Sequence, residues 1–258
     1  MNTGRRNAAA GTVLALVGWW AGCSRLAAPW QGHAKTTGTI RALVVTGANL
    51  ERERFFAVFQ QYADVAYREA GLRGGDKAFA DASEWDCNVI VWADAGELPS
   101  AAQRANVERL LKKGAGLVVL NDGVAAFSDW PAYRQAVGAV CAGGQRGSRG
   151  ASHMGAAGEG EEVVIHIVDG QQPITRGMND FFLAAAPGGV CVPGKGSQVL
   201  LAAGEGVAAR PVGWVRSGPG GTRVCCLQLG AEGRVYENGC FRWLLQEAIR
   251  WAAGALVD

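Results

Sequence analysis

A short apolar segment with polar residues directly behind it is the feature that most limits how this chain can fold. Residues 116–120 (GLVVL) carry no polar side chain, and Asn121, Asp122 and Gly123 follow at once. An uninterrupted apolar run of this length predicts a strand buried on both faces of a parallel sheet. In open α/β sheets, ligands bind beyond the carboxyl ends of such strands. The polar residues at this point are therefore the first candidates for a functional site.

Strand and helix patterns alternate along the rest of the chain. Apolar runs predict strands at 40–46, 86–93, 116–120, 163–168, 199–203, 211–216 and 223–229, and helical spacing predicts helices at 51–70, 99–113, 131–137 and 239–253. This alternation indicates a parallel sheet with helices on both faces. The last two strands predict a hairpin around residues 218–221. No repeat or linker divides the body, so we expect one domain over residues 39–258.

The N-terminus has the pattern of an export signal. Arg5 and Arg6 precede a mostly apolar segment, and Ala21 and Gly22 lead to Cys23. A basic start, a short apolar stretch and small residues at the cut site are typical of a secretory signal. Small residues directly before a cysteine predict a lipoprotein signal over residues 1–23, with acylated Cys23 as the mature N-terminus. Residues 24–38 would form a tether, and the protein would lie in the periplasm or cell envelope, reaching the membrane only through its lipid.

Composition excludes several kinds of site. Lys and Arg number 25 against 23 Asp and Glu, and no basic run is interleaved with aromatic residues, so we expect no nucleic-acid partner. If Cys23 is acylated, six cysteines remain, and their spacing selects none of the 15 possible disulfide patterns. Burial as free thiols is an equal alternative for Cys87 and for Cys225 or Cys226. No cysteine pair has zinc-site spacing, so we expect no metal and no cofactor.

Several segments together resemble a known family. They are RALVVTG at 41–47, the central 114–138, QQPITRGMNDF at 171–181, 211–230, and FRWLLQEAIRWAAG at 241–254. In this order and spacing, the chain from about Ile40 to Gly254 resembles the ThuA-like (trehalose-utilisation) domain of the class I glutamine-amidotransferase-like superfamily. The resemblance implies a flavodoxin-like, doubly wound α/β fold with a mostly parallel sheet, and an association with carbohydrate metabolism.

The chain departs from this family where chemistry is expected. Asn121, Gln172 and Ala231 occupy positions at which the family has histidine, whereas His153 keeps one. Amidotransferases of the superfamily place a nucleophilic cysteine after the central strand, but this chain has Asn121, so glutamine amidotransfer is not expected. The loss of imidazoles removes general bases and metal ligands. We therefore expect a degenerate protein that binds a carbohydrate or small polar ligand; no protein partner can be named.

The alternative is an enzyme that acts on a sugar or glycoside, with Asp122, His153 or Glu232 as acid or base. In both cases the predicted pocket lies at the carboxyl ends of the parallel strands. Its residues are Gly47, Asn49, Asn121, Asp122, His153, Gly230 and Glu232. Each has a plainer interpretation: Asn121 and Asp122 as an Asx turn, and His153 as a solvated loop residue. Trp92, Trp130 and Trp214 are candidates for stacking on sugar rings, or for the core.

Overall fold

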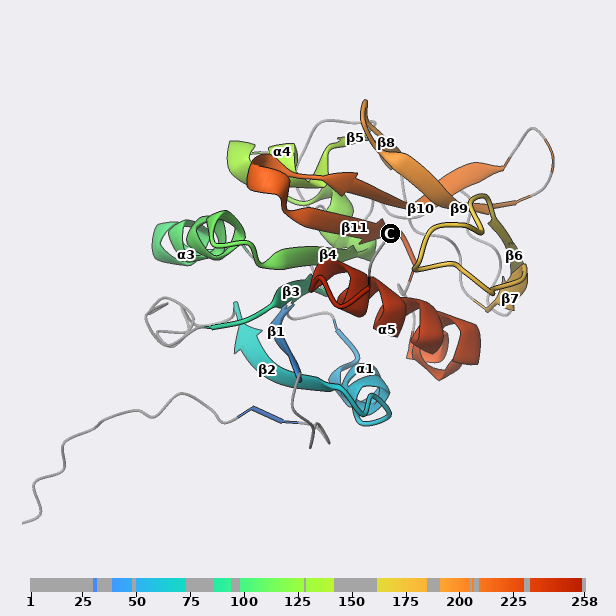
Figure 1. Cartoon of the computed structure of the whole chain (residues 1–258), viewed down its shortest axis with the longest axis horizontal. Helices are drawn as coiled ribbons and strands as arrows, with labels where there is room; N and C mark the ends of the chain where they lie inside the picture. The colour runs from blue at the N-terminus through green and yellow to red at the C-terminus, as the bar shows by residue number, and fades with distance from the viewer. Residues whose placement is uncertain are drawn as a thin grey trace, which may run out of the picture.

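A computed structural model describes residues 30–31, 39–47, 50–72, 86–93, 98–127, 129–141, 162–184, 191–204, 206, 209–229 and 233–256. Its centre is a nine-stranded sheet in the order β2-β1-β3-β4-β11-β10-β9-β6-β7 (Figure 1). These strands are β1 (Ile40–Thr46), β2 (Val65–Gly71), β3 (Val89–Trp92), β4 (Gly116–Leu120), β6 (Val163–Ile167), β7 (Phe181–Leu183), β9 (Gln198–Ala203), β10 (Arg210–Ser217) and β11 (Arg223–Leu227).

The first five strands of this order run parallel, and the other four pair antiparallel. The predicted α/β sheet is confirmed, as is the β10–β11 hairpin, whose turn holds the short helix η4 (Pro219–Gly221). The chain goes from β1 outward to β2 and then returns to the other side of β1 as β3. The topological switch point of this doubly wound sheet therefore lies between β1 and β3.

Helices cover both faces of the sheet and define two apolar cores. One core joins α1 (Arg52–Phe59) and α5 (Gly239–Ala252) to Val44, Val91 and Val118. The other joins α3 (Ala101–Lys112) and α4 (Pro131–Val137) to the alternate strand residues Val45, Trp92 and Val119. Figure 1 shows the two helix pairs on opposite sides of the sheet. The fully apolar strand sequences are thus explained, because both of their faces are buried.

The predicted helix over residues 51–70 is wrong in its second half. Helix α1 ends at Phe59, and residues 65–71 form the edge strand β2, paired in parallel with β1. The apolar residues Phe55, Phe59 and Tyr62 keep helical spacing, and Ala66 and Ala70 continue it across the turn. In the strand, Arg68 is buried and its guanidinium lies 4.6 Å from the ring centre of Trp30. That contact depends on a segment more than thirty residues earlier in the chain, so local spacing could not reveal it.

Residues Trp30 and Gln31 dock on the edge of the sheet. The Gln31 amide donates to the Tyr67 carbonyl at 2.7 Å, and the Tyr67 amide donates back at 2.8 Å. Part of the segment predicted to be a tether thus pairs with β2. No helix in the described ranges is long and apolar enough to cross a membrane.

A small second sheet lies after α4. The strands β5 (Ala139–Cys141) and β8 (Cys191–Pro193) pair antiparallel, and a disulfide joins Cys141 to Cys191. The buried amide of Gln228 fixes β8 to the main sheet, because its Nε2 donates to the Cys191 carbonyl at 2.8 Å. Cys87, Cys225 and Cys226 are buried free thiols; the sequence-based alternative expected this for Cys87 and for only one of the other two.

Candidate functional site

The carboxyl ends of the parallel strands lie in one row. The register joins Val45 of β1 to Trp92 of β3, Trp92 to Val119 of β4, and Val119 to Cys226 of β11. Gly47 and Asn121 each follow this row by two residues, with β3 between their strands. Neighbouring strands are ~4.8 Å apart, so the two backbones lie about 10 Å apart across the sheet. The fold therefore places these two predicted residues on the same edge.

Asn121 occupies an unusual position at this edge. It opens the short helix η2 (Asn121–Ala125) with a φ of 43°, in the left-handed region. Asparagine tolerates this region better than most residues, although the conformation still costs free energy. Its Oδ1 atom is buried and accepts no hydrogen bond from the described residues. Asn121 thus holds a buried amide oxygen that no described residue uses, at a strained turn.

A second strained residue closes the same turn. Phe127 has a φ of 58°, which is rare for a bulky side chain, and it is buried. Its ring packs edge-on against Trp92, with ring centres 5.2 Å apart. The packing of this ring fixes the left-handed backbone. Left-handed residues therefore bracket η2 on both sides.

Tyr133 of α4 anchors η2 through a hydrogen bond. Its hydroxyl donates to the carbonyl of Gly123 at 2.9 Å, and both groups are buried. Burial raises the pKa of Tyr133 well above its usual value, so the hydroxyl stays protonated and remains a donor. A side chain at Gly123 would be crowded, since a Cβ atom there would lie 3.0 Å from a methyl group of Val119. The turn is therefore positioned by packing as well as by hydrogen bonding.

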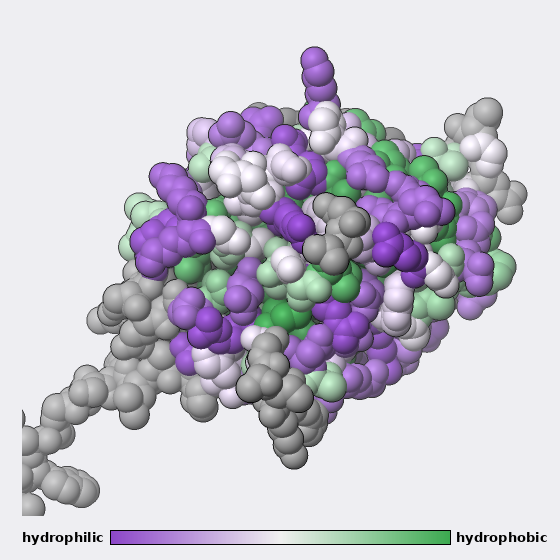
Figure 2. Space-filling model, in the orientation of Figure 1, coloured by the Kyte–Doolittle hydropathy of each residue, from purple (hydrophilic) through white to green (hydrophobic). Residues whose placement is uncertain are grey.

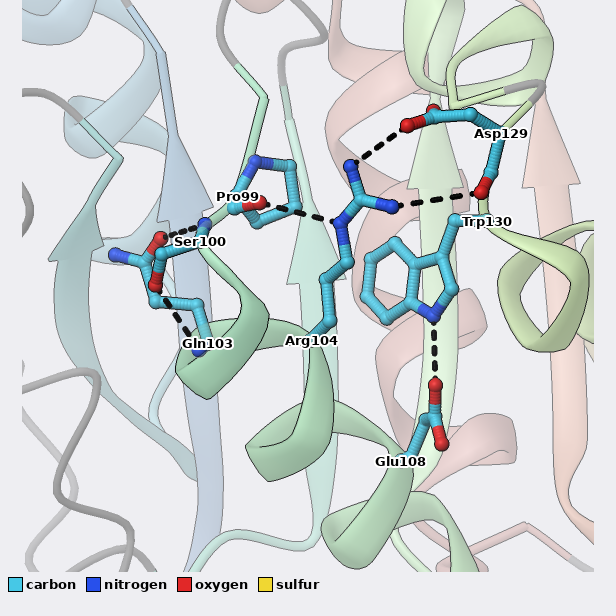
Figure 3. A network of polar contacts seen from close by, with 7 residues as sticks. All are labelled: Pro99, Ser100, Gln103, Arg104, Glu108, Asp129 and Trp130. Carbon is cyan, nitrogen blue, oxygen red and sulfur yellow. Dashed lines mark hydrogen bonds and ion pairs between the residues drawn. The ribbon is translucent and has the colours of Figure 1, made fainter.

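Polar contacts tie α3 to the residues that lead into α4 (Figure 3). The Trp130 indole donates to Glu108 at 2.8 Å, and the Arg104 guanidinium lies 5.6 Å from the Trp130 ring centre. Arg104 also pairs with Asp129 at 3.0 Å. Ser100 and Gln103 form a reciprocal capping box at the start of α3. This network anchors the end of the segment that begins at Asn121.

Glu51 joins two other predicted parts of the site. Its Oε1 accepts the backbone amide of Gly233 at 3.0 Å, and its Oε2 lies 3.2 Å from Arg54. Gly233 opens η5 (Gly233–Glu237), one residue after Glu232, and Glu51 is two residues after Asn49. Glu51 and Gly233 thus connect the segment that follows β1 with the start of η5. Sequence reasoning missed Glu51, because its partner is 182 residues away and no local pattern marks it.

The individual predictions have different outcomes. Gly47 is partly buried at the end of β1, and Asn121 and exposed Asp122 are neighbours on η2. Cys23, Asn49, His153, Gly230 and Glu232 lie outside the described residues. Trp92, Trp130 and Trp214 are all buried in the core on the α3–α4 face, which fits the plainer interpretation.

The described residues give limited means for acid–base or metal chemistry. Among them, no group of three or more His, Cys, Asp or Glu side chains is placed to hold a metal ion. Burial raises the pKa of Cys87 to about 12, and that of Cys225 well above its usual value, so these thiols stay protonated at neutral pH. His166 lies far along the sheet on β6, where its Nδ1 is 2.7 Å from Asp180. What the turn offers is mainly amide and backbone hydrogen bonding.

Comparison with known proteins places this geometry in a family. Residues 41–252 match the ThuA family, described as trehalose utilisation. The chain belongs to the ThuA family. The expected ThuA-like resemblance is thereby confirmed over nearly the whole described body.

Solved structures of other ThuA-like proteins share the fold. A putative ThuA-like protein from Parabacteroides merdae superposes with a TM-score of 0.67 at 17% identity, covering 85% of this chain and 92% of that one. A second, from Bacteroides uniformis, gives a TM-score of 0.57 at 16% identity, covering 85% and 94%. A glutamine amidotransferase from Thermotoga maritima gives 0.49 at 12% identity, covering 83% and 98%. No curated protein matches the sequence.

Proposed function

We propose that this ThuA-family protein is an exported, non-catalytic binding protein for a carbohydrate or similar polar ligand. The proposal rests on the side-chain amide of Asn121. Its amide oxygen is buried at the carboxyl edge of the sheet without a partner among the described residues, on a backbone held in the left-handed region. A buried acceptor without a partner costs about 1–3 kcal/mol, and a hydroxyl group of a ligand would remove that cost. Strained backbone of this kind is concentrated at functional sites.

The surrounding groups favour binding over turnover. An acid–base pair needs ionisable groups within hydrogen-bond reach of each other. The carboxylate of Glu51 is already engaged by the Gly233 amide and by Arg54. Asp122 is exposed on η2 and is the described acidic residue nearest to Asn121 in sequence. Amide and hydroxyl recognition is ordinary for sugar binding, and the family description supports a carbohydrate as the ligand class.

Binding should be tested with a pair of variants that separate the amide from the backbone. Asn121→Gly keeps the left-handed conformation without strain, because glycine adopts it freely. Asn121→Ala adds strain as well. We expect titration calorimetry with trehalose and with glucose to show binding by wild type that is at least tenfold weaker in Asn121→Gly, with no loss of thermal stability. Equal affinity in wild type and Asn121→Gly would refute the role of the amide.

The same preparation tests the catalytic alternative. Asp122→Asn preserves size and removes the charge. Release of reducing sugar from trehalose or aryl glycosides by wild type, abolished in Asp122→Asn, would replace the binding proposal with an enzymatic one. We expect no turnover by either protein.

Export is a separate part of the proposal. The Cys141–Cys191 disulfide supports it, because such bonds persist mainly in oxidising compartments. We infer that Cys23 carries the lipid anchor. Metabolic labelling with a fatty acid should mark wild type and fail to mark Cys23→Ala, which should leave the membrane fraction. Unlabelled wild-type protein in the cytosol would contradict this part and leave the binding proposal standing.

A further inference from the structure

A cavity lies at the end of the sheet opposite to Asn121. Its volume is about 400 Å³, within the range of about 300–1,000 Å³ that is usual for small-molecule sites. The segment 169–177 after β6, the start of β9, the end of β10 and the C-terminal turn of α5 surround it, and Figure 1 shows the segment beside that turn of α5. Its lining residues are Asp169, Gln171, Gln172, Pro173, Arg176, Gly196, Gln198, Val215, Arg216, Ser217 and Trp251.

The topology fixes this position. Val215 of β10 pairs with Gln198 at the start of β9, and Ser217 pairs with Arg223 at the start of β11. The cavity therefore lies at the amino ends of the parallel strands. Asn121 follows the carboxyl end of β4, and a strand of five residues spans about 16 Å. The cavity and the Asn121 turn are separate sites.

The carboxylate of Asp169, which hydrogen bonds keep in one orientation, forms part of the cavity wall. Asp169 accepts the Gln171 amide at 2.8 Å and the Nε2 of Gln198 at 2.5 Å. These bonds, led by the one from Gln171, lower the pKa of Asp169 below its usual value, so the group is ionised at neutral pH. The side chain is thus a fixed acceptor whose orientation is set before any ligand arrives.

The neighbouring amides and the guanidinium retain polar atoms that no described residue uses. Gln198 uses its Nε2 on Asp169, which leaves its carbonyl oxygen as an acceptor. Gln172 uses its Oε1 on the Ile174 amide at 2.6 Å, which leaves its amino group as a donor. Arg176 donates from Nη2 to the Gln171 carbonyl at 3.0 Å and keeps further N–H groups. Donors and acceptors therefore alternate around the cavity.

Apolar groups complete the wall. Pro173, Val215 and Trp251 supply them. The guanidinium of Arg216 lies on the other face of the sheet, since a Cβ atom on Gly138 would lie 1.1 Å from its Nη1. Arg216 thus lines the cavity without placing its charge there. The remaining charges are one carboxylate and one guanidinium, which disfavour an ion of either sign.

We propose that this cavity is a second binding site, for a neutral mono- or disaccharide. Sugar hydroxyls both donate and accept, so they can satisfy Asp169 and Gln198 as acceptors and Gln172 and Arg176 as donors. The apolar wall suits the C–H faces of a sugar ring. The segment QQPIT at 171–175, which the Asn121 site does not use, then has a role as part of the wall.

Trehalose and glucose are the probes, and calorimetry on the mature chain is the measurement. Gln198→Leu removes the amide at similar volume, and Asp169→Asn removes the charge at constant size. Gln135→Leu, on the exposed face of α4, is the matched control. We expect Gln198→Leu and Asp169→Asn each to weaken one binding event at least tenfold, while Gln135→Leu and Asn121→Gly leave that event unchanged.

The outcomes separate this site from the one at Asn121. Binding that Asn121→Gly abolishes and both cavity variants retain would overturn the second site and leave the proposed function intact. Binding lost only in the cavity variants would support the second site and overturn the first. No heat from either sugar with wild type at millimolar concentration would overturn this proposal as well. A thermal melt of each variant excludes simple unfolding as the cause.

Discussion

Replacing Tyr133 with phenylalanine isolates one hydrogen bond that positions the Asn121 turn. The Tyr133 hydroxyl donates to the Gly123 carbonyl at 2.9 Å, and both groups are buried. The variant keeps the ring and leaves the carbonyl without its partner. An unsatisfied buried acceptor costs about 1–3 kcal/mol. At about 2–4 °C for each kcal/mol in a domain of 150–250 residues, the melting temperature should fall by roughly 2–12 °C.

Urea unfolding followed by circular dichroism measures this loss directly. Tyr67→Phe is the matched control, because its hydroxyl bonds Gln31 at 3.2 Å on a part-buried edge where water can replace it. For Tyr67→Phe we expect the free energy of unfolding to fall by about 0.5–1.5 kcal/mol or less. Since Gly123 belongs to the same turn as Asn121, Tyr133→Phe should also lower the affinity for any ligand that binds at Asn121. Stability of Tyr133→Phe within about 0.5 kcal/mol of wild type would refute the reasoning.

Three further predictions concern stability. Replacing both cysteines of the Cys141–Cys191 disulfide, which are 50 residues apart, should cost about 2–4 kcal/mol in urea unfolding, whereas Cys240→Ser should change nothing. Gly116→Ala should prevent folding, because a Cβ atom would lie 2.1 Å from the Ala252 carbonyl; Gly71→Ala, which meets nothing within 4 Å, should yield soluble protein. Burial raises the pKa of Cys87 from 9.0 in the unfolded chain to about 12 in the folded protein. As the pH rises above 9.0, the thiol therefore ionises in the unfolded chain first, which favours unfolding. The contribution of Cys87 to the free energy of unfolding is thus full below pH 9.0 and is lost toward pH 12. Raising the pH from below 9.0 to above it should lower the urea midpoint less in Cys87→Ala than in wild type. Equal declines in the two proteins would exclude ionisation of Cys87 as the cause.

The strands and helices with a strong local pattern were predictable from the sequence. Residues 40–46 and 116–120 are strands as expected, and Asn238 caps α5 with its Oδ1 on the Phe241 amide at 3.0 Å. Strand β2 was not predictable, because the turn before it lacks glycine and proline and the helical spacing continues through it by coincidence. The three-residue strands β5, β7 and β8 are too short to carry a pattern. They exist because tertiary contacts pair them, as the disulfide pairs β5 with β8.

The candidate site was predictable in position and less so in content. Strand ends and polar residues identified Gly47, Asn121 and Asp122 on one edge. The left-handed backbone at Phe127 carries no sequence signal, and that at Asn121 carries only a weak one, because asparagine tolerates this region but does not require it. The contact of Glu51 with Gly233 joins segments whose proximity depends on the strand order. The cavity beside Asp169 was missed for the same reason, since β6, β9 and β10 meet there only in three dimensions.

The pairing of Gln31 with Tyr67 has a consequence for how copies of this protein meet. An outermost strand exposes free N–H and C=O groups, and these invite a strand from another molecule, which is a common start of aggregation. Both backbone groups of Tyr67 are occupied by Gln31, and Trp30 covers Arg68 beside it. The chain thus shields the middle of its own edge strand. At high concentration, in solution or on a surface, another copy of the protein could not add a strand at that part of the sheet edge.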